Sequence, residues 1–168
     1  MRIASLFDEL AEVTPAAAPE PPALRIVVYG VPAPQGSKRF LGVRGGRGIM
    51  VESSSRTKPW RESVKSAAIE ARNGAPPLDG PLSVRMVFTL PKPSSAPKRR
   101  RTYPQRKPDL SKLARSTEDA LTDSGLISDD ARIVEYERLA KVFPGEDPDA
   151  LEAPGVLIVV RPKEAVSV

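Results

Sequence analysis

The spacing of apolar residues predicts a series of strands along the chain. Residues 24–30, LRIVVYG, are β-branched and apolar and stop at a glycine, which is typical of a strand. Residues 40–53 predict a hairpin, because two short runs flank a Gly-Gly pair. In residues 82–90 apolar side chains recur at every second position, so one face of that strand should lie in the core. Two further strands are expected in residues 131–143 and 155–162. The apolar positions that alternate with polar ones in the first of these are Val134, Tyr136, Ala140 and Val142.

Two segments show the helical period instead. The first runs from Lys58 to Arg72, with Pro59 in the first turn, where its missing N–H does no harm. The second runs from Leu110 to Thr122 and ends before a glycine. The residues expected on the buried faces are Trp60, Val64, Ala67, Ala68 and Ala71 in the first helix, and Leu110, Leu113, Ala114, Ala120 and Leu121 in the second.

The order of these elements favours an α/β domain. Strands, a helix, a strand, a helix and two further strands build a mixed β-sheet with two helices packed on it. A chain of 168 residues suits one domain of ordinary size. We therefore assign residues 24–168 to a single folded domain.

Residues 1–23 are predicted to be a flexible tail. The run TPAAAPEPPA is rich in proline and alanine and makes an extended tether, and residues 3–12 before it carry apolar side chains at helical spacing. Two interpretations of this short amphipathic segment stay open. It is either a frayed terminus or a contact for a replication protein, since residues 5–7, Ser-Leu-Phe, resemble the end of a sliding-clamp-binding peptide.

Composition narrows the possible chemistry. The chain carries 26 Lys and Arg against 21 Asp and Glu, and this surplus favours a polyanion such as nucleic acid, although it also serves solubility alone. There is no Cys or His, which excludes disulfides, zinc fingers and catalysis by a thiol or an imidazole. No apolar run approaches the roughly 18 residues of a membrane span, and no signal-peptide pattern is present. We therefore expect a cytoplasmic protein with no membrane partner.

Six carboxylates gather in residues 107–130, directly after a loop, residues 92–107, that holds seven Lys or Arg and no acid. Asp109 lies at the start of the second helix, and the pair Asp129-Asp130 follows a short reversal that can return it to the helix. The side chains that share one face of this helix, at 100° per residue, are Ser111, Arg115 and Glu118. Two or three carboxylates could therefore converge.

Such a cluster suits a hard cation. Mg²⁺ prefers oxygen ligands, and a metal site of this kind can hydrolyse a phosphodiester without histidine. The basic loop would attract a polyanion that the acids alone would repel. A structural interpretation stays open as well: Asp109 caps the helix, its later acids form a solvated face, the Asp-Asp pair is a turn, and the run KRRR is an exposed loop.

These residues resemble the RusA family of Holliday junction resolvases, dimeric Mg²⁺-dependent endonucleases common on phages and prophages. The family pattern is a Pro-Asp-Leu-Asp-Asn-Leu run, a Lys, an Asp-Ala-Leu, a Gly and an Asp-Asp pair. The matching residues here are PDLSKL at 108–113, Arg115, DAL at 119–121, Gly125 and Asp129-Asp130. A looser similarity spans residues 24–162. The resemblance implies a homodimer that acts on branched DNA in recombination and repair.

The resemblance also assigns the candidate site. The residues that match the family's first and last catalytic aspartates are Asp109 and Asp130. The middle aspartate falls on Ser111, whose hydroxyl is a poorer Mg²⁺ ligand, and the essential lysine falls on Arg115. Either the protein is a weakened relative that binds branched DNA without cutting it, or Glu118, about 10 Å further along the same helix face, replaces the missing acid.

The expected ligands of Mg²⁺, with Mn²⁺ as a substitute, are Asp109, Asp130, Glu118 and, as the fallback, Asp129. The expected contacts with the scissile phosphate are Arg115 and Lys112. The expected DNA backbone contacts are Lys98, Arg99, Arg100, Arg101, Arg106 and Lys107. The alternatives are a non-catalytic protein that binds branched DNA and a site for a small phosphorylated metabolite.

Overall fold

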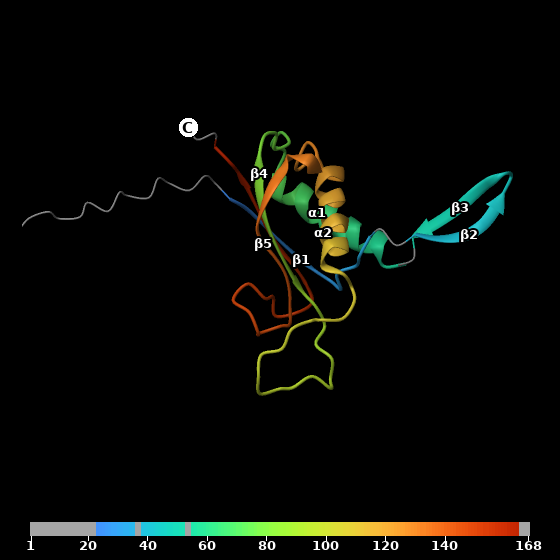
Figure 1. The fold of residues 1–168 in the computed structure, drawn as a ribbon. Helices are drawn as coiled ribbons and strands as arrows, with labels where there is room; N and C mark the ends of the chain where they lie inside the picture. Colours follow the sequence, from blue (N-terminus) through green and yellow to red (C-terminus); the bar gives the residue numbers. More distant parts are fainter. Residues whose placement is uncertain (1–22, 36–37, 53–54, 165–168) are drawn as a thin grey trace, which may run out of the picture.

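A four-stranded mixed sheet forms the centre of the fold (Figure 1). Its strands are β1 (Leu24–Tyr29), β4 (Leu82–Thr89), β5 (Ile133–Val142) and β6 (Gly155–Pro162), in the spatial order β1-β6-β4-β5. Strands β4 and β5 are parallel, and the other neighbours are antiparallel. The structure is a computed structural model and describes residues 23–35, 38–52 and 55–164. The predicted α/β class with a mixed sheet is confirmed.

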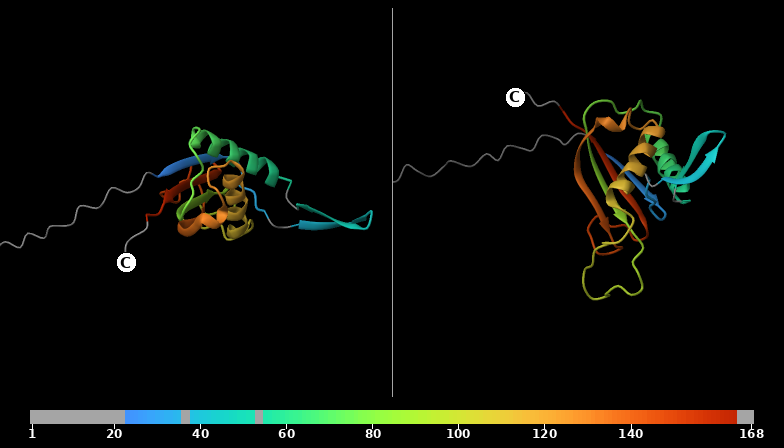
Figure 2. Two further views of the ribbon diagram at one scale, coloured as in Figure 1. Left: turned by 90° about the horizontal axis from the view of Figure 1, so that it is seen from above. Right: turned by 45° about the vertical axis from the view of Figure 1, so that its right-hand side comes forward.

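Both helices cover the same face of this sheet (Figures 1 and 2). Helix α1 (Thr57–Arg72) contacts β1, helix α2 (Leu110–Asp123) contacts β5, and the two helices contact each other. Their apolar stripes pack on the alternating side chains of β4, as predicted. The fully buried members of this main core include Val64, Val84, Met86, Phe88, Leu113 and Leu121.

A smaller apolar cluster lies on the opposite face of the sheet. It consists of Val87, Val142, Leu151, Leu157 and Val159. Leu151 comes from the loop between β5 and β6, so this loop covers part of the face that the helices leave open. The β5–β6 loop also anchors the basic loop, residues 92–107, that follows β4, and it therefore bears on function.

The prediction for β5 was wrong in its first half. Val134 and Tyr136 were expected to share a face with Ala140, but they are 62% and 42% exposed. The pairing of β5 with β4 shifts between Leu82 and Ser83, at Val134, and again between Val84 and Arg85, so that Val84 pairs with Tyr136 whereas Val87 pairs with Ala140. One extra residue in a strand moves all later side chains to the other face. The periodicity alone could not show this bulge.

The predicted hairpin is present and forms a separate two-stranded sheet that projects from the body (Figure 1). It consists of β2 (Lys38–Arg44) and β3 (Arg47–Glu52). Gly45 and Gly46 have φ of +60° and +75°, the left-handed conformation that tight hairpin turns require. The predicted tail lies almost wholly outside the described residues. None of the helices in the described ranges is long and apolar enough to span a membrane.

Candidate active site

The start of α2 places one of the predicted acids beside a predicted cation. Asp109 occupies the N-cap position, yet its side chain makes no capping hydrogen bond and is 51% exposed. The Nζ atom of Lys112 lies 3.3 Å from Asp109 Oδ2. Asp109 therefore does not act as the side-chain cap that the structural interpretation expected, and its carboxylate stands at the protein surface beside a positive charge.

Two further acids come from α2 and from the short helix that follows it. Glu118 on α2 is partly buried, and Asp130 begins the short 3₁₀ helix η1 (Asp130–Arg132), which contacts α2. Burial raises the pKa of Glu118 above its usual value, and the charges of Asp130 and Asp119 raise this pKa further, while Arg115 opposes them. Two acids that repel each other in this way are a pair that a bound cation would stabilise.

Tyr136 on β5 contacts Glu118. Its hydroxyl donates a hydrogen bond to Glu118 Oε1. The bulge in β5 turns Tyr136 toward α2, and bulges near functional sites often re-aim one side chain in this way. The sequence pattern gave no sign of this role, because it grouped Tyr136 with Ala140 and Val142 on one apolar face of the strand.

Asp129 is engaged differently from Asp130. Its side chain accepts a hydrogen bond from the backbone N of Ala131 at 2.7 Å and so caps η1. The structural interpretation of this residue as part of a turn therefore holds. Of the two adjacent aspartates, Asp130 is the one whose charge raises the pKa of Glu118.

The acids do not form one compact cluster. Across residues 23–35, 38–52 and 55–164, no group of three or more acidic side chains stands close enough to hold a metal ion in this arrangement. Glu118 and Asp130 are brought together, whereas Asp109 lies nine residues before Glu118, about 13 Å along the helix axis. Even so, the donor set suits Mg²⁺, which proteins often hold with one or two carboxylates together with substrate phosphates.

The remaining acids of α2 have structural partners. Asp119 accepts a hydrogen bond from Gln35 Nε2 and lies 3.6 Å from Arg61, which also pairs with Asp123. Arg61 Nη1 donates to Gln35 Oε1 at 3.0 Å. This network ties the segment after β1 to both helices. It replaces the solvated face of the structural interpretation and was not visible in the sequence, because its members come from three distant segments.

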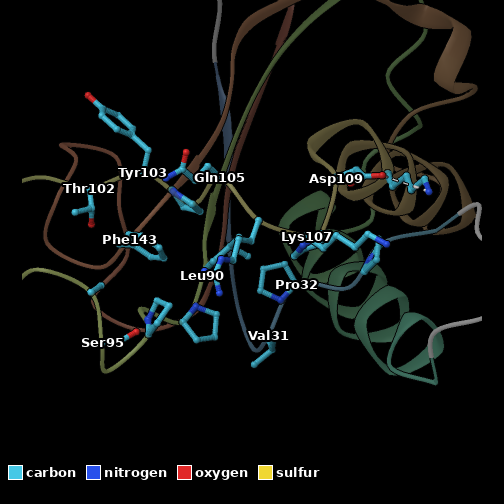
Figure 3. A pocket seen from close by; sticks show the side chains of 18 of the residues that line it. Val31, Pro32, Leu90, Ser95, Thr102, Tyr103, Gln105, Lys107, Asp109 and Phe143 are labelled. Carbon is cyan, nitrogen blue, oxygen red and sulfur yellow. Dashed lines mark ion pairs between the residues drawn. The ribbon is translucent and has the colours of Figure 1, made fainter.

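A pocket of about 760 Å³ opens next to Asp109 (Figure 3). Its walls come from residues 31–34 and from the basic loop between β4 and α2, and the buried residues among them are Pro32, Leu90, Pro104 and Phe143. The cations that line it are Arg56, Arg100, Arg106, Lys107 and Lys112, and the acid that lines it is Asp109. The pocket therefore joins the acidic end of α2 to the predicted DNA-binding loop.

The predicted DNA contacts divide into three groups. Arg100, Arg106 and Lys107 line the pocket. Lys98 and Arg99 are exposed on the same loop but do not line it. Arg101 is bound elsewhere in the protein, since its Nη2 lies 2.8 Å from Asp147 Oδ2 and its guanidinium lies 5.0 Å from the centre of the Tyr103 ring.

The loop between β5 and β6 anchors the basic loop. Glu146 Oε2 accepts hydrogen bonds from the backbone N and the hydroxyl of Thr102, both at 3.0 Å, and Glu146 also pairs with Lys92. The pKa of Glu146 is lowered, first by Lys92 and then by Thr102. Lys141 on β5 donates to the carbonyl oxygens of residues 106 and 108 at 3.0 and 2.9 Å. These contacts hold a long loop without secondary structure in one arrangement.

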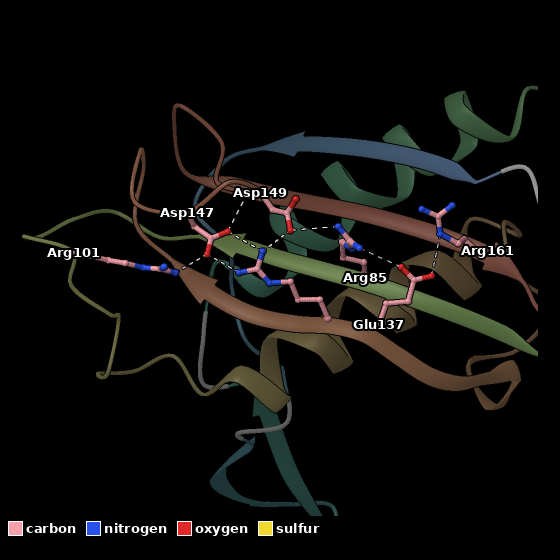
Figure 4. Close-up of polar contacts among 7 residues, drawn as sticks. Arg85, Arg101, Glu137, Asp147, Asp149 and Arg161 are labelled. Carbon is pink, nitrogen blue, oxygen red and sulfur yellow. Dashed lines mark hydrogen bonds and ion pairs between the residues drawn. The ribbon is translucent and has the colours of Figure 1, made fainter. Parts of the chain in front are cut away.

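Asp147 connects this anchor to a network of charges on the open face of the sheet (Figure 4). It pairs with Arg101 and with Arg138, and Arg138 also pairs with Asp149. Hydrogen bonds from Arg138 lower the pKa of Asp147 and, in return, raise that of the guanidinium. Further along the sheet, Arg85 and Arg161 pair with Glu137. The roles of these acids could not be predicted from the sequence, because their partners lie on other strands and loops.

Fold and site together define an α/β protein that sets acidic side chains against a basic surface suited to a polyanion. Comparison with known families identifies it further: the family model described as endodeoxyribonuclease RusA matches residues 30–151. The chain belongs to this family of endodeoxyribonucleases, which act on branched DNA. The predicted family is thus confirmed. A search of curated proteins found no match.

Proposed function

We propose that the protein is a Mg²⁺-dependent endonuclease that resolves four-way or other branched DNA junctions by hydrolysing phosphodiesters. The observation that carries this proposal is the contact between α2, which bears Glu118, and η1, which bears Asp130, together with a pocket at the Asp109 end of α2 that is lined by five cations and one acid. Acids alone would repel DNA, and cations alone would bind it without cutting.

The acids of this region would hold the metal ion. Asp109, Asp130 and Glu118 are the proposed ligands of Mg²⁺, for which Mn²⁺ can substitute: Glu118 and Asp130 would share one ion, and Asp109, about 13 Å away along the helix axis, would hold another. Bound metal would activate water and neutralise charge on the phosphate. Glu118 is favoured over Asp129 as the replacement for the missing acid at Ser111, because Asp129 already caps η1 while Glu118 faces Asp130. The pKa of Glu118 is raised in the absence of a cation, which supports this choice.

The cations would position the DNA. Arg115 lowers the pKa of Glu118 through its charge, and Lys112 lies beside Asp109. These positions support both residues as the proposed contacts with the scissile phosphate. The exposed cations of the basic loop, including Lys98 and Arg99, would bind the backbone of the arms. Binding through phosphates should weaken steeply as salt is raised.

We also propose that the protein acts as a homodimer in the cytoplasm. A four-way junction has two equivalent strands to cut, and a two-fold symmetric dimer matches that symmetry. The cytoplasmic location follows from chromosomal or phage DNA as the proposed substrate. A contact between the tail and a replication protein stays a prediction that concerns residues outside the described ranges.

One observation favours a second candidate function. Ser111 stands where the family has an acid, and no three acids of the described segments are grouped for a metal. A relative with a decayed metal site would bind branched DNA without cutting it. A synthetic four-way junction incubated with protein in Mg²⁺ and in EDTA separates the two. We expect symmetric nicks in Mg²⁺ alone, whereas binding without nicks would select the second function. Turnover of free nucleotides without DNA cleavage would point to the metabolite site instead.

A further inference from the structure

The pocket beside Asp109 has a composition that the proposed cleavage chemistry does not require. Its lining is dominated by rigid apolar groups, which include Leu90, Phe143 and a set of prolines, namely Pro32, Pro34, Pro91, Pro93, Pro97, Pro104 and Pro108. Contacts with phosphates alone need only an open basic surface. A deep apolar wall next to cations indicates a ligand that has both a flat apolar part and a negative charge.

We infer that this pocket receives one unstacked nucleotide from the branch point of the DNA, a role that rests on the proposed function. Its volume of about 760 Å³ falls in the range of sites for small molecules, so it is suited to a nucleotide and not to a duplex. The base would pack on the proline and Phe143 side of the pocket. The phosphates would lie among Arg100, Arg106 and Lys107.

The charge balance of the pocket supports an anionic occupant. Five cations and one acid line it, and that acid, Asp109, lies at one end together with Lys107 (Figure 3). A nucleotide in the pocket would therefore place its phosphate next to the proposed cutting site. Bases at a branch point are the easiest to extrude, because they have lost part of their stacking and pairing.

The pocket is also held in shape before any ligand binds. Glu146 fixes the basic loop at Thr102, and Lys141 fixes it at the carbonyl oxygens of residues 106 and 108. A preformed wall needs little ordering when the ligand enters, which favours binding. The anchors on the β5–β6 side thus contribute to recognition without touching the DNA.

A fluorescent base tests the inference. The wild-type protein is added in EDTA, to saturation by gel shift, to a four-way junction with 2-aminopurine at the branch point or in the middle of an arm. Fluorescence should rise at least about threefold for the branch-point probe and stay unchanged for the arm probe, because 2-aminopurine brightens when it leaves the stack. Mg²⁺ is then added to the same samples and nicks are scored.

Two matched pairs of variants locate the effect. Arg100→Gln removes a cation that lines the pocket, and Arg25→Gln removes an exposed cation of β1 that does not line it. Val31→Trp narrows the pocket from an exposed lining position, and Ile69→Trp adds the same ring at an exposed position of α1 outside it. We expect Arg100→Gln and Val31→Trp to reduce the fluorescence rise at least fivefold at saturation, and both controls to retain it.

The outcomes separate this inference from the proposed function. No rise at the branch point, or an equal rise in all four variants, overturns the nucleotide pocket even if Mg²⁺ produces nicks. If Arg100→Gln and Val31→Trp abolish the fluorescence rise, the nucleotide pocket is supported. This holds even if Mg²⁺ produces no nicks, and in that case only the proposed nuclease activity fails.

Discussion

Removal of the Asp147 charge should destabilise the protein more than removal of any exposed acid. The side chain of Asp147 is 1% exposed. It accepts hydrogen bonds from Nη1 and Nη2 of Arg138 at 2.8 and 2.6 Å, from Arg101 at 2.8 Å and from the backbone N of Asp149 at 3.0 Å. The change Asp147→Asn keeps the size of the side chain but turns an amide donor toward guanidinium donors.

The size of the effect follows from these contacts. Each hydrogen bond to a charged partner contributes about 1.5–3 kcal/mol when buried, and the two from Arg138 form a bidentate pair. The side chains of Arg138 and Arg101 are 31% and 50% exposed, so water can replace some of the hydrogen bonds that they lose. Arg138 also keeps Asp149 as a partner. We therefore expect a loss of about 2–3 kcal/mol. For a domain of this size, that corresponds to a fall in the melting temperature of roughly 4–12 °C.

Urea and thermal unfolding of the wild type and the variant measure this loss. Asp79→Asn is the matched control, because Asp79 is 64% exposed in its ion pair with Arg132 at 2.9 Å. Exposed pairs of this kind contribute about 0–1 kcal/mol. If Asp147→Asn cost no more stability than Asp79→Asn, the anchoring role assigned to Asp147 would be wrong.

Three further predictions concern the site and its surroundings. Glu118→Gln should retain or raise the melting temperature, since it removes a charge that burial and Asp130 oppose, yet lower Mg²⁺-dependent cleavage about tenfold or more; full activity would contradict the metal role. The pKa of Asp147 is lowered, so its stabilisation is complete at neutral pH and lost as pH falls below about 4; acid titration of unfolding should show a smaller loss for Asp147→Asn. Replacing Lys98 and Arg99 with Gln should lower the slope of log affinity against log salt by up to about 2, and an unchanged slope would exclude them as phosphate contacts.

Much of the fold was readable from local periodicity. The alternation in β4 and the 3.6-residue stripes of α1 and α2 correspond closely to the side chains that the main core buries. The first half of β5 was not readable, because the bulge between Tyr136 and Arg138 depends on pairing with β4. A residue inserted in the pairing leaves the sequence pattern of the strand unchanged and still reverses its faces.

The site, like the fold, could be predicted from the sequence only in part. Asp109 and Asp130 were predicted as site residues from the family resemblance, and the structure brings η1, which bears Asp130, into contact with α2, which bears Glu118. The contacts that orient the basic loop were missed, because Glu146 and Asp147 lie some 45 residues after the groups that they bind. Arg101 shows the consequence, since a cation that looked free in the sequence is held by a buried carboxylate.

Asp109, at the start of α2, and Asp130, on η1, are the acids on which the proposed metal-dependent cleavage depends most. The most direct measurement compares Asp109→Asn and Asp130→Asn with Asp123→Asn in cleavage of a four-way junction with Mg²⁺ and with EDTA. Asp123 is the control because its side chain is 51% exposed, as is that of Asp109, and it pairs with Arg61. We predict symmetric nicks that need Mg²⁺ for the wild type and Asp123→Asn, and none for the other two. Equal cleavage by all four proteins, or cleavage in EDTA, would contradict the account.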